Sequence, residues 1–149
     1  MSELRATWGG PVPAPGVREL QDRAAVAALA AIYALGLDLD DLPLCRSAFA
    51  QDAMAGPEDG ELLAIDEHLA MVRRMVQAAP SAQHVIAQQL IRIDGDQAEM
   101  WSSGLGIVDG RVVSGQQYRD TCRRHPGGWL IAERRIRLQW LDPVARASS

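Results

Sequence analysis

The stretch AAVAALAAIYALGL, residues 24–37, runs for fourteen residues without a charged side chain, and Asp38 follows it directly. Tyr33 lies inside this stretch, five residues before the aspartate. A helix that is apolar on all sides is normally buried, so a phenol and a carboxylate on it need partners inside the molecule. The stretch therefore predicts a core helix over about residues 17–39. That helix carries either a structural hydrogen-bond network or one wall of a reactive cavity.

The composition is typical of a soluble globular protein, with 48% hydrophobic and 23% charged residues. A chain of 149 residues corresponds to about one domain, and its net charge of −4 argues against a nucleic-acid binder. All fifteen cationic side chains are arginines, which excludes lysine Schiff-base chemistry. Cys45 and Cys122 are far apart and nothing marks the chain as secreted, so we expect two reduced thiols in a cytoplasmic protein.

Breaker residues divide the chain into three parts. Glycines and prolines dominate residues 9–16, so residues 1–16 are predicted to form a flexible N-terminal arm. Residues 17–142 are predicted to form a single domain, and residues 143–149 a C-terminal tail. The apolar run at 24–37 is shorter than the roughly 20 residues that a membrane span needs, so no membrane contact is expected.

Two shorter helices are predicted after the core helix. Asp41 and Pro43 are typical of a helix start and predict a helix that continues through Ala50. Asp66 predicts the cap of a third helix, which ends before Pro80.

After Pro80 the apolar period changes from about 3.6 residues to 2, which indicates strands. The connecting segments resemble hairpin turns, so the strands are expected to form an antiparallel meander. The four alternating segments are 83–93, 97–108, 112–124 and 129–141. The fold class is therefore α+β, with three helices on one face of a sheet that Gly104 and Gly106 allow to bend. Such a sheet closed by a long helix makes a cone with an interior pocket.

Arg134 interrupts the apolar row of the last predicted strand. A lone buried guanidinium is costly, so a carboxylate partner is expected. Asp120 lies on the neighbouring predicted strand in the row Tyr118, Asp120, Cys122. We predict a structural ion pair between Arg134 and Asp120.

Several segments, in this order and spacing, resemble SnoaL-like proteins of the nuclear-transport-factor-2-like superfamily. They are QDR (21–23), AFAQDA (48–53), QHV (83–85), IDGDQA (93–98), YRD (118–120) and GWLIAERR (128–135). The resemblance implies a cone-shaped α+β barrel, commonly dimeric, with a pocket between helix and sheet. It also implies cofactor-free dehydratase, isomerase or cyclase chemistry in many members, whereas other members are catalytically silent.

The resemblance implies a site formed by Tyr33, Asp38 and His84. It is similar to the site of bile acid 7α-dehydratase and scytalone dehydratase, in which a tyrosine and an aspartate on the first helix face a histidine on a strand. A neutral imidazole at His84 can remove a proton next to a carbonyl. Asp38 would orient the imidazole, and Tyr33 would donate to the developing oxyanion. The alternative is that each of these side chains is an ordinary hydrogen-bonded core residue.

Further residues are expected to line the pocket and bind substrate, although ordinary core packing is an alternative for each aromatic and methionine. They are Phe49, Met54, Met71, Gln88, Trp101, Ser103 and Tyr118. His84 is expected to share a strand face with Ile86, Gln88 and Leu90, and His68 is expected to be solvated beside two acidic residues.

The sequence thus predicts an acid–base dehydratase, cyclase or isomerase that acts on a hydrophobic carbonyl compound. Three scattered histidines and two distant cysteines offer no zinc spacing, and no dinucleotide fingerprint is present, so neither a metal nor a cofactor is expected. The alternative is a non-catalytic ligand-binding or assembly module, such as a small subunit of a larger enzyme. In either case we expect a homodimer that pairs through the outer face of the sheet.

Overall fold

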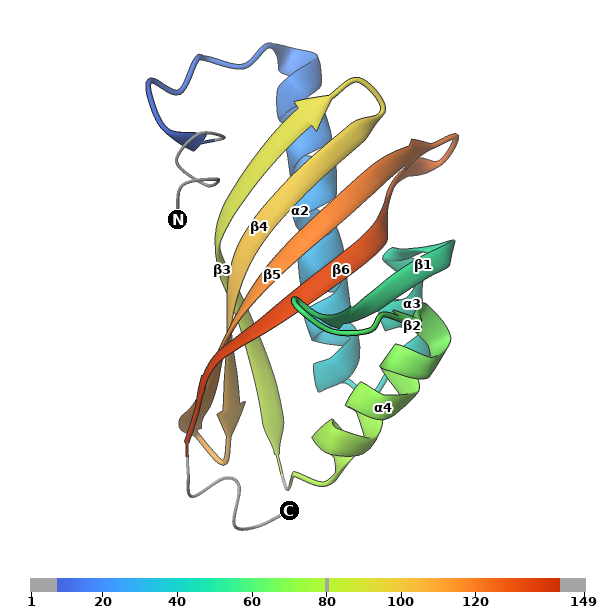
Figure 1. The fold of residues 1–149 in the computed structure, drawn as a ribbon, viewed down its shortest axis with the longest axis vertical. Coiled ribbons are helices and arrows are strands. Elements are labelled where there is room, and N and C mark those ends of the chain that lie inside the picture. Colours follow the sequence, from blue (N-terminus) through green and yellow to red (C-terminus); the bar gives the residue numbers. More distant parts are fainter. Residues whose placement is uncertain (1–7, 80, 143–149) are drawn as a thin grey trace.

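The computed structural model describes residues 8–79 and 81–142, which form helices followed by a curved sheet (Figure 1). The residues predicted as a C-terminal tail, 143–149, and residues 1–7 of the predicted arm lie outside the described residues. The helices are α2 (Val17–Asp38), α3 (Leu42–Ser47) and α4 (Ile65–Gln77). The strands are β1 (Phe49–Pro57), β2 (Leu63–Ala64), β3 (Ala82–Asp94), β4 (Gln97–Val108), β5 (Arg111–His125) and β6 (Gly128–Leu141).

The fold is α+β and cone-like, with an open six-stranded sheet in the order β2-β1-β6-β5-β4-β3. The predicted meander is present as β3 to β6, and each neighbouring pair in it is antiparallel. The expectation of a purely antiparallel sheet is wrong, because β1 joins β6 in parallel. β2 pairs with β1 and extends that edge of the sheet. α2 crosses one face of the sheet, while α3 and α4 lie beside β1 and β2 (Figure 1).

Strand β1 replaces a segment that was predicted to be partly helix and partly loop. The second helix ends at Ser47, and Phe49 already pairs with Ile131 of β6. The segment has few side chains that favour strands, since four of its nine residues are alanine or glycine. Its partner strand lies about eighty residues further along the chain, so no local pattern announces the pairing.

α2 is the central helix of the molecule. It is long and apolar enough, by length and composition, to cross a membrane. Here it packs along the sheet instead, and Val26, Leu29, Ala30, Tyr33 and Leu37 are buried at helical spacing. This packing brings Asp38, the last residue of the helix, to the first residues of β3.

The two faces of the sheet follow from the burial of alternating residues. On β4, Met100 and Ser102 are buried against α2, and their neighbours Trp101 and Ser103 are therefore on the outer face. A bulge at residues 88–89 shifts this alternation on β3, where Gln88 has a φ of 51°. As a result Leu90 pairs with Trp101 on the outer face, and the expectation that it shares a face with His84 is wrong.

Candidate functional site

Asp38 and His84 contact each other where the end of α2 meets the start of β3. The Nδ1 atom of His84 lies 2.7 Å from Oδ1 of Asp38. The backbone N–H of His84 also donates to both carboxylate oxygens of Asp38, at 2.9 and 3.1 Å. The two side chains are 15% and 18% exposed, so they are shielded but can be reached from outside. The backbone contact fixes the strand against the helix, and the side-chain contact orients the imidazole.

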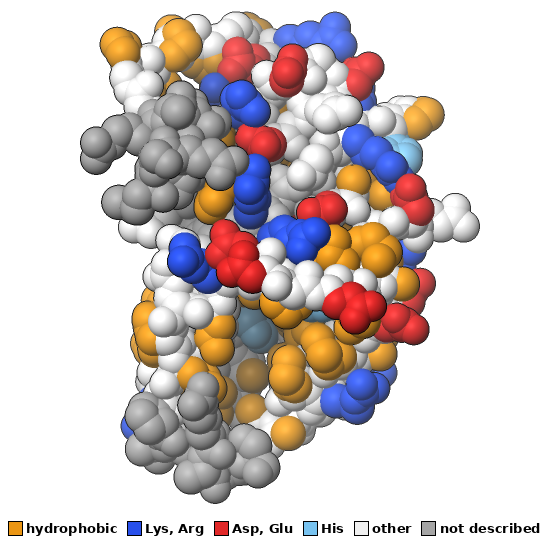
Figure 2. Space-filling view, viewed as in Figure 1, with side chains coloured by type: hydrophobic (Ala, Val, Ile, Leu, Met, Phe, Trp, Pro, Cys, Tyr) orange, Lys and Arg blue, Asp and Glu red, His pale blue; other side chains and the backbone are white. Residues whose placement is uncertain are grey.

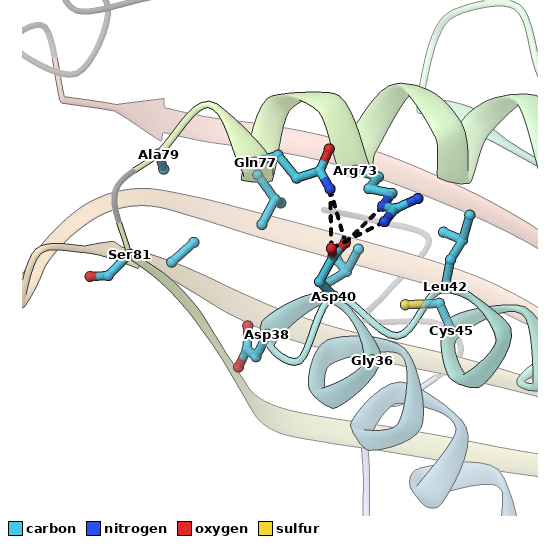
Figure 3. Close-up of a pocket in the computed structure, with 12 residues that line it drawn as sticks. Gly36, Asp38, Asp40, Leu42, Cys45, Arg73, Gln77, Ala79 and Ser81 are labelled. Carbon is cyan, nitrogen blue, oxygen red and sulfur yellow. Dashed lines mark hydrogen bonds and ion pairs between the residues drawn. The ribbon is translucent and has the colours of Figure 1, made fainter.

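A cavity of about 310 Å³ adjoins this pair (Figure 3). Its walls are the end of α2, α3, the second half of α4 and the residues just before and at the start of β3. Asp38 lines it, and so does Cys45, whose thiol pKa is raised to about 11, mainly by burial. The residues of the lining are Gly36, Leu37, Asp38, Asp40, Leu42, Cys45, Arg73, Val76, Gln77, Ala79, Ser81 and Ala82.

One wall of the cavity is fastened by polar contacts between α4 and the loop that follows α2. Arg73 donates to Asp40 through Nε at 2.7 Å and through Nη2 at 3.1 Å, and Gln77 donates to the same carboxylate. Figure 3 shows Asp40 turned toward α4, whereas Asp38 lies nearer to β3. The Arg73 guanidinium holds the pKa of Asp40 below its usual range. Asp38 and Asp40 therefore have different roles, although they are two residues apart.

The molecule is also visibly hollowed between the lower part of the sheet and α4 (Figure 2). Hydrophobic side chains surround this hollow, and histidine atoms lie within it (Figure 2).

Tyr33 packs in a buried cluster of aromatic rings around Arg134. Its ring is buried and meets Phe49 and Tyr118 edge to face, with centroids 5.9 and 6.5 Å away. The guanidinium carbon of Arg134 lies 4.3 Å from the centre of the Tyr33 ring. Burial raises the pKa of Tyr33, so its phenol stays protonated near neutral pH. The structure thus brings together two of the three predicted catalytic residues and places the third in an aromatic cluster.

The predicted ion pair between Arg134 and Asp120 is present and almost completely buried. Nε and Nη2 of Arg134 donate to the two carboxylate oxygens at 2.7 and 2.8 Å, in the two-pronged geometry that favours arginine. The residues face each other across β5 and β6. Three aromatic rings, from Tyr33, Tyr118 and Phe49, surround the guanidinium at 4.3 to 5.4 Å.

The predicted substrate-binding residues are scattered, and none of the seven is in the lining of the 310 Å³ cavity. Phe49 and Tyr118 are buried in the aromatic cluster, and Met71 is half-buried on α4. Gln88 is exposed at the bulge of β3. Trp101, Ser103 and Met54 are on the outer face: Trp101 lies under Arg119, and Met54 pairs with Glu133. A role for these three in an interior pocket is therefore wrong.

His68 was expected to be solvated and is instead buried, with only 2% of its surface exposed. α4 begins at Ile65, with Ala64 rather than Asp66 at its cap, and Asp66 binds Arg46 at 2.7 Å. His68 lies three residues after Ile65 and so shares the inner face of the helix with Ile65 and Leu69. The acidic neighbours that suggested exposure lie on another side of the helix. The helical spacing, rather than the flanking charges, carried the correct signal.

No group of three or more histidine, cysteine or acidic side chains suited to a metal ion occurs among residues 8–79 and 81–142.

A family model described as a SnoaL-like domain matches residues 18–135 of the chain. Among solved structures, a variant of the Rv3472 protein of Mycobacterium tuberculosis, of unknown function, is 22% identical with a TM-score of 0.75. That match covers 91% of this chain and 90% of the other. An NTF2-like protein with a cystatin-like fold from Novosphingobium aromaticivorans is 22% identical with a TM-score of 0.72, covering 89% of this chain and 91% of the other.

The hexachlorocyclohexane dehydrochlorinase LinA-type3 of Novosphingobium barchaimii LL02 is 17% identical, with a TM-score of 0.71. The match covers 84% of this chain and 91% of the other. No curated protein sequence matches the chain. At these identities the structural likenesses establish a shared fold and leave the chemistry to be argued from the site itself.

Proposed function

Because the chain belongs to the SnoaL-like domain family, we propose that it is a cofactor-independent acid–base enzyme acting on a hydrophobic carbonyl compound. The observation that carries this proposal is the 2.7 Å contact between Asp38 and His84 Nδ1 beside a cavity. A paired carboxylate and imidazole, partly shielded from water, is the arrangement that general base catalysis requires.

The contact also favours one ring nitrogen of His84 as the base. A carboxylate facing Nδ1 favours the tautomer with the proton on Nδ1, which leaves the lone pair of Nε2 free to accept a proton. When the imidazole takes up a proton from carbon, Asp38 stabilises the positive charge that forms. Removal of a proton next to a carbonyl leaves an enolate on the substrate.

Three outcomes follow from the same enolate. Loss of a leaving group from the next carbon is a dehydration or a related elimination. Return of the proton at another carbon is an isomerisation, and attack of the enolate on a second carbonyl is a ring closure. A structural neighbour described as a dehydrochlorinase favours elimination, and we therefore propose a lyase.

The alternative is a non-catalytic ligand-binding or assembly module of the same fold. The packing of Tyr33 in a buried cluster with Arg134 favours this alternative, because ordinary core packing accounts for its position. We also propose that the protein is cytoplasmic; Cys45 and Cys122 are both free and buried.

Hydrogen exchange at carbon tests the proposal without knowledge of the natural substrate. The protein is incubated in D2O with a panel of aryl ketones and 3-hydroxyketones, and loss of the α-proton signal is followed by NMR. We expect the native protein to accelerate exchange, and His84→Gln and Asp38→Asn to lower that acceleration by about 10²-fold or more.

The control is His125→Gln, because His125 ends β5 beside Arg123, whereas His84 aligns through Gly106 with Ser114 at the opposite end of β5. It should exchange α-protons at the native rate. Native exchange in a folded His84→Gln variant would exclude His84 as the base. Tight binding of the panel compounds without any exchange would establish the non-catalytic alternative.

A further inference from the structure

Among the buried polar atoms without a hydrogen-bond partner in the described part of the chain, three belong to His68 and Arg134. They are both ring nitrogens of His68 and the Nη1 atom of Arg134. The two residues are 2% and 1% exposed. A buried donor or acceptor without a partner costs about 1–3 kcal/mol, so a ligand or water oxygen that pairs with these atoms would be stabilised there.

The surroundings of Arg134 explain why its own neighbours leave Nη1 unpaired. Asp120 occupies Nε and Nη2. The other neighbours are the rings of Tyr33, Tyr118 and Phe49, whose faces accept no conventional hydrogen bond. The Tyr33 hydroxyl is also close to the guanidinium, but it makes no hydrogen bond of normal geometry to Nη1. Nη1 therefore offers two N–H donors in an apolar, aromatic setting.

His68 supplies the second polar group of this region. Burial, followed by the nearby Arg134 charge, lowers the pKa of His68 to about 4. At neutral pH the ring is uncharged and presents one N–H donor and one acceptor nitrogen. Because its tautomer is not held by any described neighbour, either ring nitrogen can donate to an incoming oxygen.

We propose that His68 and Nη1 of Arg134 form a polar subsite that binds a carbonyl or carboxylate oxygen at one end of the ligand. The Arg134 charge is already matched by Asp120, so the subsite selects for a hydrogen-bond acceptor rather than for net negative charge. The aromatic rings around the guanidinium favour a flat apolar body behind that oxygen.

The subsite deepens the proposed function and rests on it for the position of the reacting carbon. Tyr33 covers Arg134, and Asp38 holds His84, so five residues of α2 separate the two sites. That spacing is about 7.5 Å along a helix. The proposed substrate therefore carries this acceptor oxygen well separated from its reactive carbon.

Three probes of similar size test the subsite: benzoate, acetophenone and ethylbenzene, which carry a carboxylate, a ketone and no oxygen. Each is titrated into protein labelled with ¹⁵N in the histidine rings, and the His68 resonances are followed by NMR. We expect benzoate or acetophenone to shift the His68 ring signals at concentrations where ethylbenzene does not. A response to benzoate alone identifies the oxygen as a carboxylate, and a response to both identifies any carbonyl.

Two variants separate binding from folding. His68→Gln keeps an amide donor and acceptor and should retain affinity for the oxygen-bearing probes. His68→Leu removes both, and we expect about tenfold weaker binding of those probes with ethylbenzene unaffected. A purely structural His68 would instead change all three affinities alike. Unshifted His68 signals with every probe, or a bridging water that no probe displaces, would overturn the proposal.

The same titrations on His84→Gln keep the two proposals apart. Probe binding requires no proton transfer, so the subsite is expected to respond normally in this variant. A native protein that gives a normal His68 response but does not accelerate α-proton exchange would remove the catalytic proposal and leave the subsite. The reverse result would remove the subsite and leave the catalytic pair.

Discussion

At the scale of single residues, His68 makes the stability of the protein depend on pH. Its pKa is lowered from 6.5 to about 4 in the folded protein, mainly by burial, so the unfolded chain binds a proton more readily between these values. The stabilising contribution of neutral His68 is complete above pH 6.5 and is lost as the pH falls toward 4. Between pH 7 and pH 5 we expect it to remove about 2 kcal/mol from the free energy of unfolding.

Urea unfolding at the two pH values measures this loss. His68→Leu should lose about 2 kcal/mol less than the native protein between pH 7 and pH 5, because its side chain does not titrate. His125→Gln is the matched control and should lose as much as the native protein. An equal loss in the native protein and the leucine variant would show that His68 is already accommodated as a cation.

At the scale of elements, the missing side chain of Gly104 on β4 leaves room for the ring of Tyr118 on β5. A Cβ atom at Gly104 would lie 2.7 Å from the ring of Tyr118, whereas a Cβ atom at Gly127 would meet nothing within 4 Å. Gly104→Ala must displace the Tyr118 ring, which is packed near Arg134, and should destabilise the protein by about 1–3 kcal/mol. Chemical denaturation compares it with Gly127→Ala, for which we expect a change below about 1 kcal/mol. Equal effects of the two substitutions would show that Tyr118 is free to move.

The elements also show what the sequence could and could not predict. α2 and the four strands of the meander follow from local periodicity, and the contact between Asp38 and His84 lies where the resemblance placed it. β1 was missed because its pairing with β6 is parallel and distant in sequence. The bulge on β3 was missed because one inserted residue leaves no compositional trace, yet it reverses the face of every residue beyond it.

The candidate site was harder to predict than the fold for a related reason. Trp101 and Ser103 were assigned to the pocket by their chemistry, although Met100 and Ser102 are the buried members of the alternation. The contacts of Arg73 with Asp40 span 33 positions and leave no local signal. Residue type predicts the chemistry that a side chain can perform. Whether the side chain lies in the interior depends on the face of the strand or helix that carries it.

At the scale of the whole molecule, the outer face of the sheet carries apolar side chains that no described residue covers fully. Val85, Leu90, Leu105 and Trp140 are between 38% and 50% exposed. Register places Val85 opposite Leu105, and Leu90 opposite Trp101, on the same face. An apolar, twisted sheet face flanked by charged residues is suited to pairing with a second copy of itself.

We therefore propose a homodimer through this face, with twice the 16.2 kDa mass of the single chain. Leu105→Glu places a charge at the centre of the apolar face, and burying two such charges against each other would be costly. We expect this variant to sediment as a monomer under conditions in which the native protein sediments as a dimer. Met75→Glu is the control, because Met75 is 61% exposed on α4 and should leave the dimer intact. A native protein that remains monomeric at high micromolar concentration would contradict the proposal, because the apolar face would then be stable in water.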